Sequence, residues 1–305
     1  KIGSAKIIYE PLFLRKKVLY CRMMTNKVLY ICGPSASGKT SFSIELAKHI
    51  PNAVFINADT MQLYKGMEPL AAHPTTSEMA KIDGRLFGIL EMSQNISRSE
   101  WLAMAKKEIE KTFKDGKQPI LIGGARSLAA ALAQAAYGIK LDVNQKNEPT
   151  FPEEPNKKLD FPYDLHSIIL MPSGEDIEKN VLKRLKQNSE LSLNAITKAR
   201  EGGYTNFMPA MGTIGVKEYS DVLDGKMTLP QAEKEIVRRG ISYIEEQKSL
   251  FSELGRKIKL QDPLKSLTIT SSSLDERISK TLDFMEKINT SKKFINDHKA
   301  SGISL

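Results

Sequence analysis

The sequence predicts an α/β fold: a parallel β-sheet flanked by helices, with a helical insertion and a helical C-terminal region added. Three observations lead to this prediction. Short aliphatic runs alternate with amphipathic helical patterns in the first part of the 305-residue chain, and such alternation is typical of a parallel sheet. A glycine-rich turn follows the first run. From Asp176 to Leu254 the pattern is almost wholly helical.

The expected strands are four buried aliphatic runs, residues 27–31, 53–56, 119–122 and 167–171. Helices are expected between them, over residues 40–50, 99–113 and 127–137. Pro51 ends the first helix, and Ser97 or Ser99 is placed to cap the second. Because each helix lies between two strands, the strands are expected to run parallel, with helices on both faces of the sheet.

Composition excludes several classes of protein. Hydrophobic residues make up 41% and charged residues 27% of the chain, a globular composition with enough apolar residues for a core. The two cysteines are too few for a disulfide framework or a cysteine-rich zinc site. Because the longest small-apolar stretch, Leu128–Ile139, falls short of the ~20 residues that a span needs, no membrane is expected. The net charge of +9 suits a polyanionic partner, but much of it lies near the two ends of the chain.

The chain divides into five expected segments. Basic and apolar residues mix in the first, which is either an upstream extension or a transit peptide, with the working protein beginning near Met23 or Met24. The others are a catalytic core, a linker with a helical insertion, a helical return to the core and a polar C-terminal tail. In this order the segments are residues 1–22, 23–139, 140–209, 210–254 and 255–305.

A phosphate-binding loop follows the first expected strand. Its eight residues match the P-loop pattern G-x-x-x-x-G-K-[ST]: Gly33, Pro34, Ser35, Ala36, Ser37, Gly38, Lys39 and Thr40. The backbone N–H groups and the start of the next helix form an anion-binding nest, which makes the predicted sheet P-loop NTPase-like. Lys39 is placed to neutralise phosphate charge, and the Thr40 hydroxyl to bind Mg²⁺. The loop predicts a polyphosphate ligand without showing that it is ATP.

Three further blocks carry a family resemblance. They are NADTMQLYKGM at residues 57–67, GGARSL at 123–128 and AMGTIGVKEY at 210–219. In this order after this P-loop, they resemble the tRNA dimethylallyltransferases, isopentenyltransferases that act on adenine. The corresponding family patterns are NADSMQVYKGM, a VGGTGLY-like turn and AxxxIGYKE. The resemblance spans about residues 28–251.

The resemblance implies an unusual use of the P-loop. In this family it holds the pyrophosphate of dimethylallyl diphosphate, while the exocyclic N6 of an adenine attacks the allylic carbon. Lys39, Mg²⁺ and the loop amides would stabilise the departing pyrophosphate. Asp59 matches the catalytic aspartate, which accepts a proton from N6 or orients it; as an alternative, it is a turn or cap residue. Further substrate contacts are expected from Gln62, which would reach the base edge, and from Thr60, Gly123, Gly124 and Arg126.

The resemblance also implies a tRNA partner. The target adenosine lies beside the anticodon and must leave its base stack, and the helical insertion would grip the anticodon stem-loop. Each candidate phosphate contact is equally well read as part of a solvated helix face; the candidates are Lys183, Arg184, Lys186, Lys198, Arg200, Lys217, Arg238 and Arg239. With too few cysteines for the zinc finger of eukaryotic members, a bacterial-type enzyme is expected, cytoplasmic and monomeric, or organellar if residues 1–22 are a transit peptide.

Some residues depart from the family patterns. Ala125 stands where the family has threonine, so a hydroxyl is lost from the turn. The block TRxYAKRQ aligns with residues 240–247, which retain Tyr243 and Gln247. The arginine of that block becomes Ile241, and its lysine and arginine become Glu245 and Glu246. Arg238 or Arg239 is close enough in sequence to replace the lost cation.

Three functions therefore stay open. The first is prenyl transfer to adenine in tRNA, or to free AMP. The second is a catalytically degenerate tRNA-binding relative, suggested by the residues lost at 125, 241, 245 and 246. The third is a P-loop small-molecule kinase or ATPase, for which Arg98, Arg126 and Arg184 are available as lid arginines.

Overall fold

The computed structural model describes residues 26–50, 52–143, 159–205 and 208–300. The expected extension, residues 1–22, and most of the expected linker lie outside these residues. Six strands form one sheet in the order β3-β2-β4-β1-β5-β6, and every neighbouring pair is parallel. The strands are β1 (Lys27–Cys32), β2 (Ala53–Asn57), β3 (Asp83–Arg85), β4 (Gln118–Gly123), β5 (Asp164–Leu170) and β6 (Ser266–Ile269). The predicted parallel α/β fold is confirmed.

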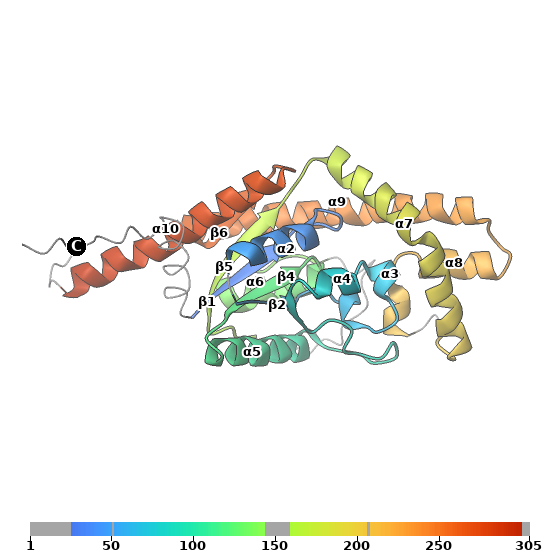
Figure 1. Cartoon of the computed structure of the whole chain (residues 1–305), viewed down its shortest axis with the longest axis horizontal. Coiled ribbons are helices and arrows are strands. Elements are labelled where there is room, and N and C mark those ends of the chain that lie inside the picture. The colour runs from blue at the N-terminus through green and yellow to red at the C-terminus, as the bar shows by residue number, and fades with distance from the viewer. Residues whose placement is uncertain (1–25, 51, 144–158, 206–207, 301–305) are drawn as a thin grey trace, which may run out of the picture.

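Helices cover both faces of the sheet, as alternate residues of the central strand show. Val28, Tyr30 and Cys32 pack on one face, in a core shared with α5 (Arg98–Lys114), α6 (Arg126–Tyr137) and α9 (Leu229–Gln261). Leu29 and Ile31 point to the opposite face, in a core shared with α2 (Lys39–His49) and α10 (Leu274–Ala300). Figure 1 shows the resulting three layers. Because both faces are covered, β1 is buried along its whole length.

Local sequence signals set the helix boundaries. Ser97 begins α5 with a capping box, in which its Oγ accepts from Glu100 N at 3.1 Å and its N–H donates to Glu100 Oε2 at 2.7 Å. The predicted serine cap is therefore confirmed. Helix α6 ends where Gly138 adopts a left-handed conformation, with φ 68°. No helix among the described residues is long and apolar enough to cross a membrane.

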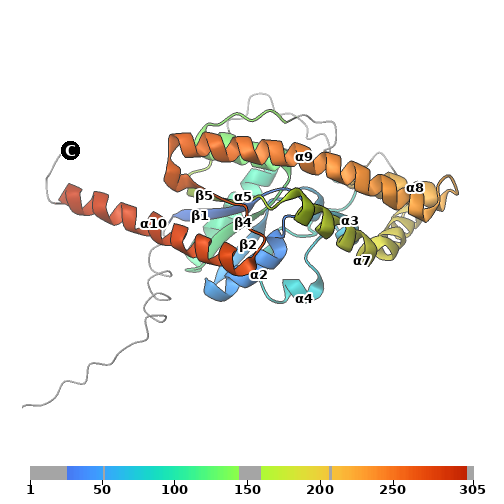
Figure 2. The same cartoon turned by 90° about the horizontal axis from the view of Figure 1, so that it is seen from above.

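A helical lobe stands at one end of the sheet. It contains α7 (Gly174–Glu201), α8 (Val216–Leu223), η3 (Pro209–Gly212) and the first part of α9, and it packs on η1 (Met61–Leu63) and on α3 (Glu68–Ala71). The short helix α4 (Thr76–Met79) follows α3. Figures 1 and 2 show the lobe at one end of the molecule and α10 extending past the other. The core of the lobe is apolar, with Met67, Ile196 and Tyr219 almost fully buried.

Two of the expected segment boundaries differ from the structure. The range 140–209 was expected to be linker and insertion, but it contains β5, which pairs with β1 over six residues in the middle of the sheet. Of the described elements that lie wholly within that range, α7 belongs to the lobe and β5 to the sheet. The range 255–305 was expected to be a polar tail, but β6 extends the sheet and α10 buries Ile278, Phe284, Met285 and Ile288. The signal was weak because β6 has four residues, only one of them fully buried.

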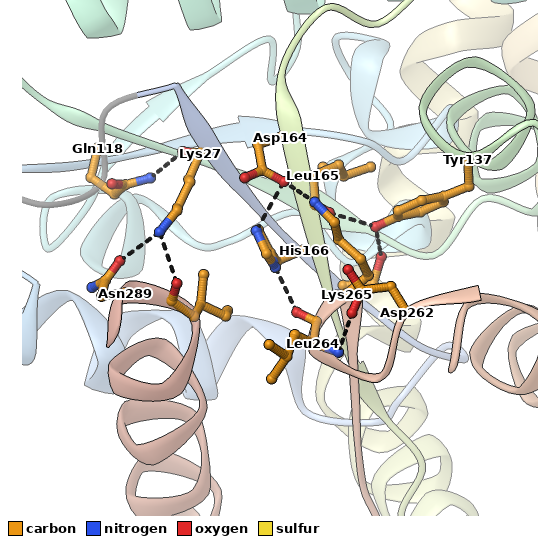
Figure 3. A network of polar contacts seen from close by, with 12 residues as sticks. Lys27, Gln118, Tyr137, Asp164, Leu165, His166, Asp262, Leu264, Lys265 and Asn289 are labelled. Atoms are coloured by element: carbon orange, nitrogen blue, oxygen red, sulfur yellow. Dashed lines mark hydrogen bonds and ion pairs between the residues drawn. The ribbon is translucent and has the colours of Figure 1, made fainter. Parts of the chain in front are cut away.

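Buried polar contacts hold this C-terminal segment at the amino ends of the strands (Figure 3). Lys27 Nζ donates to Ile288 O at 3.1 Å and to Asn289 Oδ1 at 2.9 Å, which joins β1 to α10. His166 on β5 reaches Leu264 O with Nδ1, at 2.8 Å, and its Nε2 lies 3.1 Å from Asp164 Oδ1. Leu264 belongs to η4 (Pro263–Lys265). The segment is therefore an integral part of the fold.

The packing of α10 on the sheet can be tested by measuring stability. Met285 on α10 is fully buried, so Met285→Ala is expected to lower the free energy of unfolding by about 2–5 kcal/mol. The control Glu286→Ala changes an exposed neighbour and is expected to stay within about 0.5 kcal/mol of the parent. Urea unfolding of the full chain measures both. Equal, small effects of the two substitutions would show that α10 does not pack on the sheet.

Candidate active site

The P-loop lies at the carboxyl end of β1, in the middle of the sheet. Its first residue, Gly33, has φ +144°, and a Cβ there would lie 2.3 Å from Leu170 O, so only glycine fits. Gly38, with φ +85°, turns the chain directly into α2. The N-terminus of this helix therefore faces the loop, which makes the loop an anion site.

The turn after β4 packs directly against the P-loop. A Cβ on Gly123 would lie 2.1 Å from Ala58 O, and one on Gly124 would lie 2.6 Å from Gly33 O. The carboxyl ends of β1, β2 and β4 therefore meet backbone against backbone. As predicted, this brings the P-loop, Asp59 and the two glycines of the second block together.

Lys39 is held inside the loop. Its Nζ donates to Gly33 O at 3.0 Å and to Pro34 O at 2.8 Å. Burial lowers its pKa from 10.5 to about 8, an effect that the nearby Asp59 carboxylate partly opposes. The lysine is thus a desolvated cation within range of one carboxylate, in a loop built to receive an anion.

Asp59 is a turn residue, which is one of the two roles that the sequence left open, and it is also accessible from a cavity. Its Oδ1 accepts from Met61 N at 3.2 Å, and Asn57 Oδ1 accepts from the Asp59 N–H at 2.9 Å, so it is a turn residue after β2. It also lines a cavity beside the P-loop. The backbone contacts fix the carboxylate in place, and the cavity gives it access to a ligand.

This cavity lies between the carboxyl edge of the sheet and the helical lobe, and its volume is about 150 Å³. Its polar lining includes Ser35, Asp59, Thr60, Arg184, Thr213 and Tyr243. Its apolar lining includes Met61, Leu70, Val181, Leu185, Ile214 and Ile244. One end is therefore charged and next to the P-loop, and the rest offers an apolar surface.

Arg184 lies in this cavity, although the sequence suggested a contact with tRNA on the outer face of the lobe. It follows Val181 and precedes Asn188 at helical spacing, and all three line the cavity. Burial lowers the pKa of its guanidinium, while Asp59 acts in the opposite direction. The helical spacing was the available signal, but sequence alone did not show which face of α7 turns inward.

Among the buried hydroxyls without a hydrogen-bond partner in the described part of the chain, two lie beside this site: Ser37 Oγ in the P-loop and Thr60 Oγ1 after β2. Unsatisfied buried polar groups are costly, so each is a candidate ligand contact. Thr40 is partly exposed in the first turn of α2, at the position where a P-loop binds a metal. These residues were all predicted to contact substrate or metal.

Gln62 is placed differently from the prediction. Its Nε2 donates to Ala71 O at 3.2 Å and to Ala72 O at 2.9 Å, and it is not among the residues that line the cavity. It therefore ties η1 to the end of α3 rather than reaching a base edge. Its tie to the turn after α3 holds the wall of the cavity in place.

Arg126 is also not in the cavity lining. It is 3% exposed, forms an ion pair with Glu246, and its guanidinium carbon lies 5.0 Å from the centroid of the Tyr243 ring. Tyr243 does line the cavity, so Arg126 supports it from behind. The pair also explains one departure from the family pattern: a glutamate replaces an arginine at 246, and an arginine stands at 126, where the family turn has glycine.

The other departures are explained in part. Ala125 occupies the N-cap position of α6 and makes no side-chain hydrogen bond there. A threonine at this position would accept one from the helix backbone. Ile241 packs with Ala36 of the P-loop in a small apolar cluster. Gln247, which the chain retains, accepts from Ser35 N at 2.8 Å and donates to Gly124 O at 2.7 Å, and so clamps the P-loop to the turn after β4.

Half of the eight expected tRNA contacts already have carboxylate partners. Arg200 pairs with Asp224, Lys217 with Asp221, Arg238 with Glu235, and Arg239 with Glu218. Arg238 and Arg239 do not line the cavity, so neither replaces the cation lost at 241. Among the described residues, Lys183, Lys186 and Lys198 are exposed on α7 without an ion pair. These three lysines, the α7 lysines below, are exposed cations that a polyanion can reach.

The comparisons with known proteins agree with this geometry. The model of the IPP transferase family matches residues 62–146. The tRNA dimethylallyltransferase of Pelagibacter ubique is 40% identical over 99 residues, which are 32% of this chain and 31% of that protein. The enzyme of the same name from Granulibacter bethesdensis is 26% identical over 281 residues, 75% of this chain and 88% of that protein. The chain is therefore similar to IPP transferases, over residues 62–146 to the family model and over most of its length to the Granulibacter bethesdensis protein.

Two solved structures of similar proteins share the fold. The tRNA isopentenylpyrophosphate transferase of Bacillus halodurans superposes with a TM-score of 0.69 at 23% identity, over 90% of this chain and all of the other. A eukaryotic dimethylallyltransferase acting on tRNA superposes with a TM-score of 0.64 at 17% identity, over 92% of this chain and 80% of the other. The aligned segments span about a third of the first curated relatives, from 31% to 36% of their length.

The position of Lys39 predicts a pH dependence of anion binding. The lysine binds phosphate as a cation, so the affinity for inorganic pyrophosphate should fall as pH rises through the Lys39 pKa of about 8, by about tenfold between pH 7 and 9. Since the folded pKa lies below the unfolded value of 10.5, the empty protein should gain stability between about pH 8 and 10.5. Calorimetric titration of pyrophosphate measures the affinity.

The variant Lys39→Met is the reference for this test, because pyrophosphate itself titrates in the same range. The ratio of the two affinities isolates the lysine. A ratio that stays constant from pH 7 to 9 would show that Lys39 does not hold the phosphate.

Proposed function

We propose that this chain transfers a dimethylallyl group from dimethylallyl diphosphate to N6 of an adenosine next to the tRNA anticodon, with release of pyrophosphate. One observation carries the proposal. Ser35 of the P-loop, Asp59 and Arg184 line a single cavity with a largely apolar remaining surface, and Lys39 is held in the same loop. Phosphate, a prenyl group and an amine acceptor each have a matching surface there. The curated relatives described above are named tRNA dimethylallyltransferases, which supports the proposal.

The chemistry needs stabilisation of the leaving pyrophosphate and removal of a proton from N6. The bond from the allylic carbon to the diphosphate oxygen breaks, and the N6–carbon bond forms. Negative charge then grows on the leaving pyrophosphate, next to Lys39, Arg184 and the amides at the start of α2. The proton that N6 loses goes to the Asp59 carboxylate and from there to solvent. The adenine amine is a weak nucleophile, so its placement by the rigid turn at Asp59 matters more than basicity.

Mg²⁺ fits this site as a partner of the diphosphate. The described residues contain no group of three or more acidic, histidine or cysteine side chains able to hold a metal ion. Mg²⁺ commonly binds through substrate phosphates and water with few protein ligands. Thr40 would hold the ion, with Asp59 as the nearest carboxylate on the cavity wall. When bound, the ion neutralises charge on the diphosphate.

We also propose that the lobe holds the tRNA. The α7 lysines are exposed and lie on the helix whose other face lines the cavity. Exposed ion pairs such as that of Arg200 with Asp224 are weak and can give way to phosphate. We infer a cytoplasmic, monomeric enzyme, in which one chain supplies both the cavity and the tRNA contacts.

Of the alternatives, a degenerate tRNA-binding relative has one observation in its favour: the uncapped Ala125 on the cavity wall. The kinase alternative has less support. Of its three expected lid arginines only Arg184 lines the cavity, whereas Arg126 is bound to Glu246.

Prenyl transfer tests the proposal. The full chain is incubated with Mg²⁺, dimethylallyl diphosphate and unmodified tRNA that reads codons beginning with U, and N6-isopentenyladenosine is sought by mass spectrometry. Asp59→Asn and Lys39→Met are each expected to lower kcat/KM by about 100-fold or more. Lys48→Met removes an exposed lysine of the same helix α2, paired with Glu45, and is expected to change nothing.

AMP and ATP serve as parallel substrates. Product on AMP alone would overturn the tRNA assignment, and phosphoryl transfer from ATP without prenyl transfer would favour the kinase. Folded protein that binds tRNA but makes no product would favour the remaining alternative, a catalytically degenerate tRNA-binding relative.

Ala125→Thr tests how far this position limits the enzyme. Threonine at the start of α6 can accept from the backbone N–H of Leu128, so the variant is expected to gain about 1 kcal/mol of unfolding free energy. Its hydroxyl also enters the cavity, where a severalfold rise in prenyl transfer is expected. Thermal unfolding and the same tRNA assay measure the two effects. If stability rises but the rate does not, the lost hydroxyl is not what limits the chemistry.

A further inference from the structure

The P-loop is held by one side chain from each of three C-terminal helices. Asn180 of α7 donates to Ala36 O at 2.9 Å, Gln247 of α9 accepts from Ser35 N at 2.8 Å, and Arg277 of α10 donates from Nη1 to Ser37 O at 2.9 Å. Consecutive residues of the loop are therefore bound by three different helices. Two of these side chains are neutral amides. The third is a cation, and it comes from the segment that the sequence suggested was a polar tail.

Arg277 is buried and has no carboxylate partner among the described residues. It is 5% exposed. Its Nε donates to Ser271 O at 2.6 Å, so both of its observed hydrogen bonds go to backbone carbonyls. Its Nη1 would lie 3.0 Å from a Cβ on Gly38, which places the guanidinium directly against the loop. Burial lowers its pKa, while the more distant Asp176 acts in the opposite direction.

A buried cation without a paired anion is unfavourable unless something compensates it. For Arg277 the chain supplies two carbonyl oxygens, those of Ser271 and Ser37. An arginine has five N–H donors, and two hydrogen bonds to carbonyls satisfy only part of them. The nearest built anion site is the P-loop itself, on the other side of the Ser37–Gly38 peptide. A diphosphate in the loop would supply the missing negative charge.

The hydrogen bond from Arg277 to Ser37 O also affects the Ser37–Gly38 peptide. A cation on a carbonyl oxygen withdraws electron density from the peptide and makes its N–H a stronger donor. The N–H in question belongs to Gly38, the last residue before α2, where the loop amides face the phosphate. The charge of Arg277 and the polarised amide therefore favour anion binding in the same direction.

We propose that Arg277 is a positioning residue of the phosphate site, which strengthens the hold of the P-loop on a diphosphate through the Ser37 carbonyl. Helix α10 thus contributes a side chain to the phosphate site. The identity of the prenyl donor rests on the proposed function, but the role of Arg277 needs only a diphosphate in the loop.

The test measures the affinity of the full chain for inorganic pyrophosphate by calorimetry, with and without Mg²⁺. Arg277→Gln keeps a donor for Ser37 O but removes the charge, and is expected to weaken binding about tenfold. Arg277→Lys keeps the charge on a shorter group and is expected to weaken it about threefold. Lys280→Gln is the matched control. It removes an exposed cation of the same helix, paired with Glu276, and is expected to bind as the parent does.

A structural role alone gives a different pattern. Arg277→Gln would then lower the melting temperature while leaving the pyrophosphate affinity of the folded fraction unchanged, and that result overturns the proposal. If Arg277→Gln does not fold, Arg277→Lys decides: a loss of about threefold against Lys280→Gln supports the proposal, and parental affinity overturns it.

Prenyl transfer separates this proposal from the proposed function. In an active enzyme, Arg277→Gln should raise KM for dimethylallyl diphosphate and leave KM for tRNA unchanged. If the parent chain makes no prenylated tRNA but Arg277→Gln still binds pyrophosphate more weakly, the proposed function fails and the role of Arg277 stands.

Discussion

The site depends on the close approach of three backbone turns at the carboxyl edge of the sheet. Gly33 lies against Leu170, Gly123 against Ala58, and Gly124 against the carbonyl of Gly33, each too close for a side chain to fit between. This contact sets the P-loop, Asp59 and the start of α6 in one relative position. Any side chain at these glycines would force the turns apart and move the lysine away from the carboxylate.

The sheet supplies these turns, but it does not close the site. Helices α7, α9 and α10 each bind a different residue of the P-loop, and α7 and α9 also form walls of the cavity. Segments far apart in the sequence therefore meet at one loop of eight residues. Such a loop is organised before a ligand arrives, and preorganised donors lose little on binding and act fully when charge develops.

Much of this arrangement was predictable from sequence. The four main strands and their helices follow from aliphatic runs, capping residues and breakers, and the P-loop follows from spacing alone. The rest depended on tertiary context. Arg184 and the α7 lysines share one helix, and only packing decides which of them turns inward. The four-residue β6 is stabilised as a strand by its pairing with β5. Likewise, the sequence showed at Glu246 only the loss of a cation from the family pattern, and the structure showed that this glutamate pairs with Arg126.

Amide hydrogen exchange of the full chain, with and without inorganic pyrophosphate, tests most directly whether this edge of the sheet is the diphosphate site. Pyrophosphate should increase protection in the P-loop, in the turn around Asp59, in the turn from Gly123 to Arg126 and in the part of α7 that carries Arg184. Protection elsewhere, at the amino ends of the strands around His166 for example, should not change. Unchanged exchange in the P-loop at a saturating pyrophosphate concentration would contradict the account.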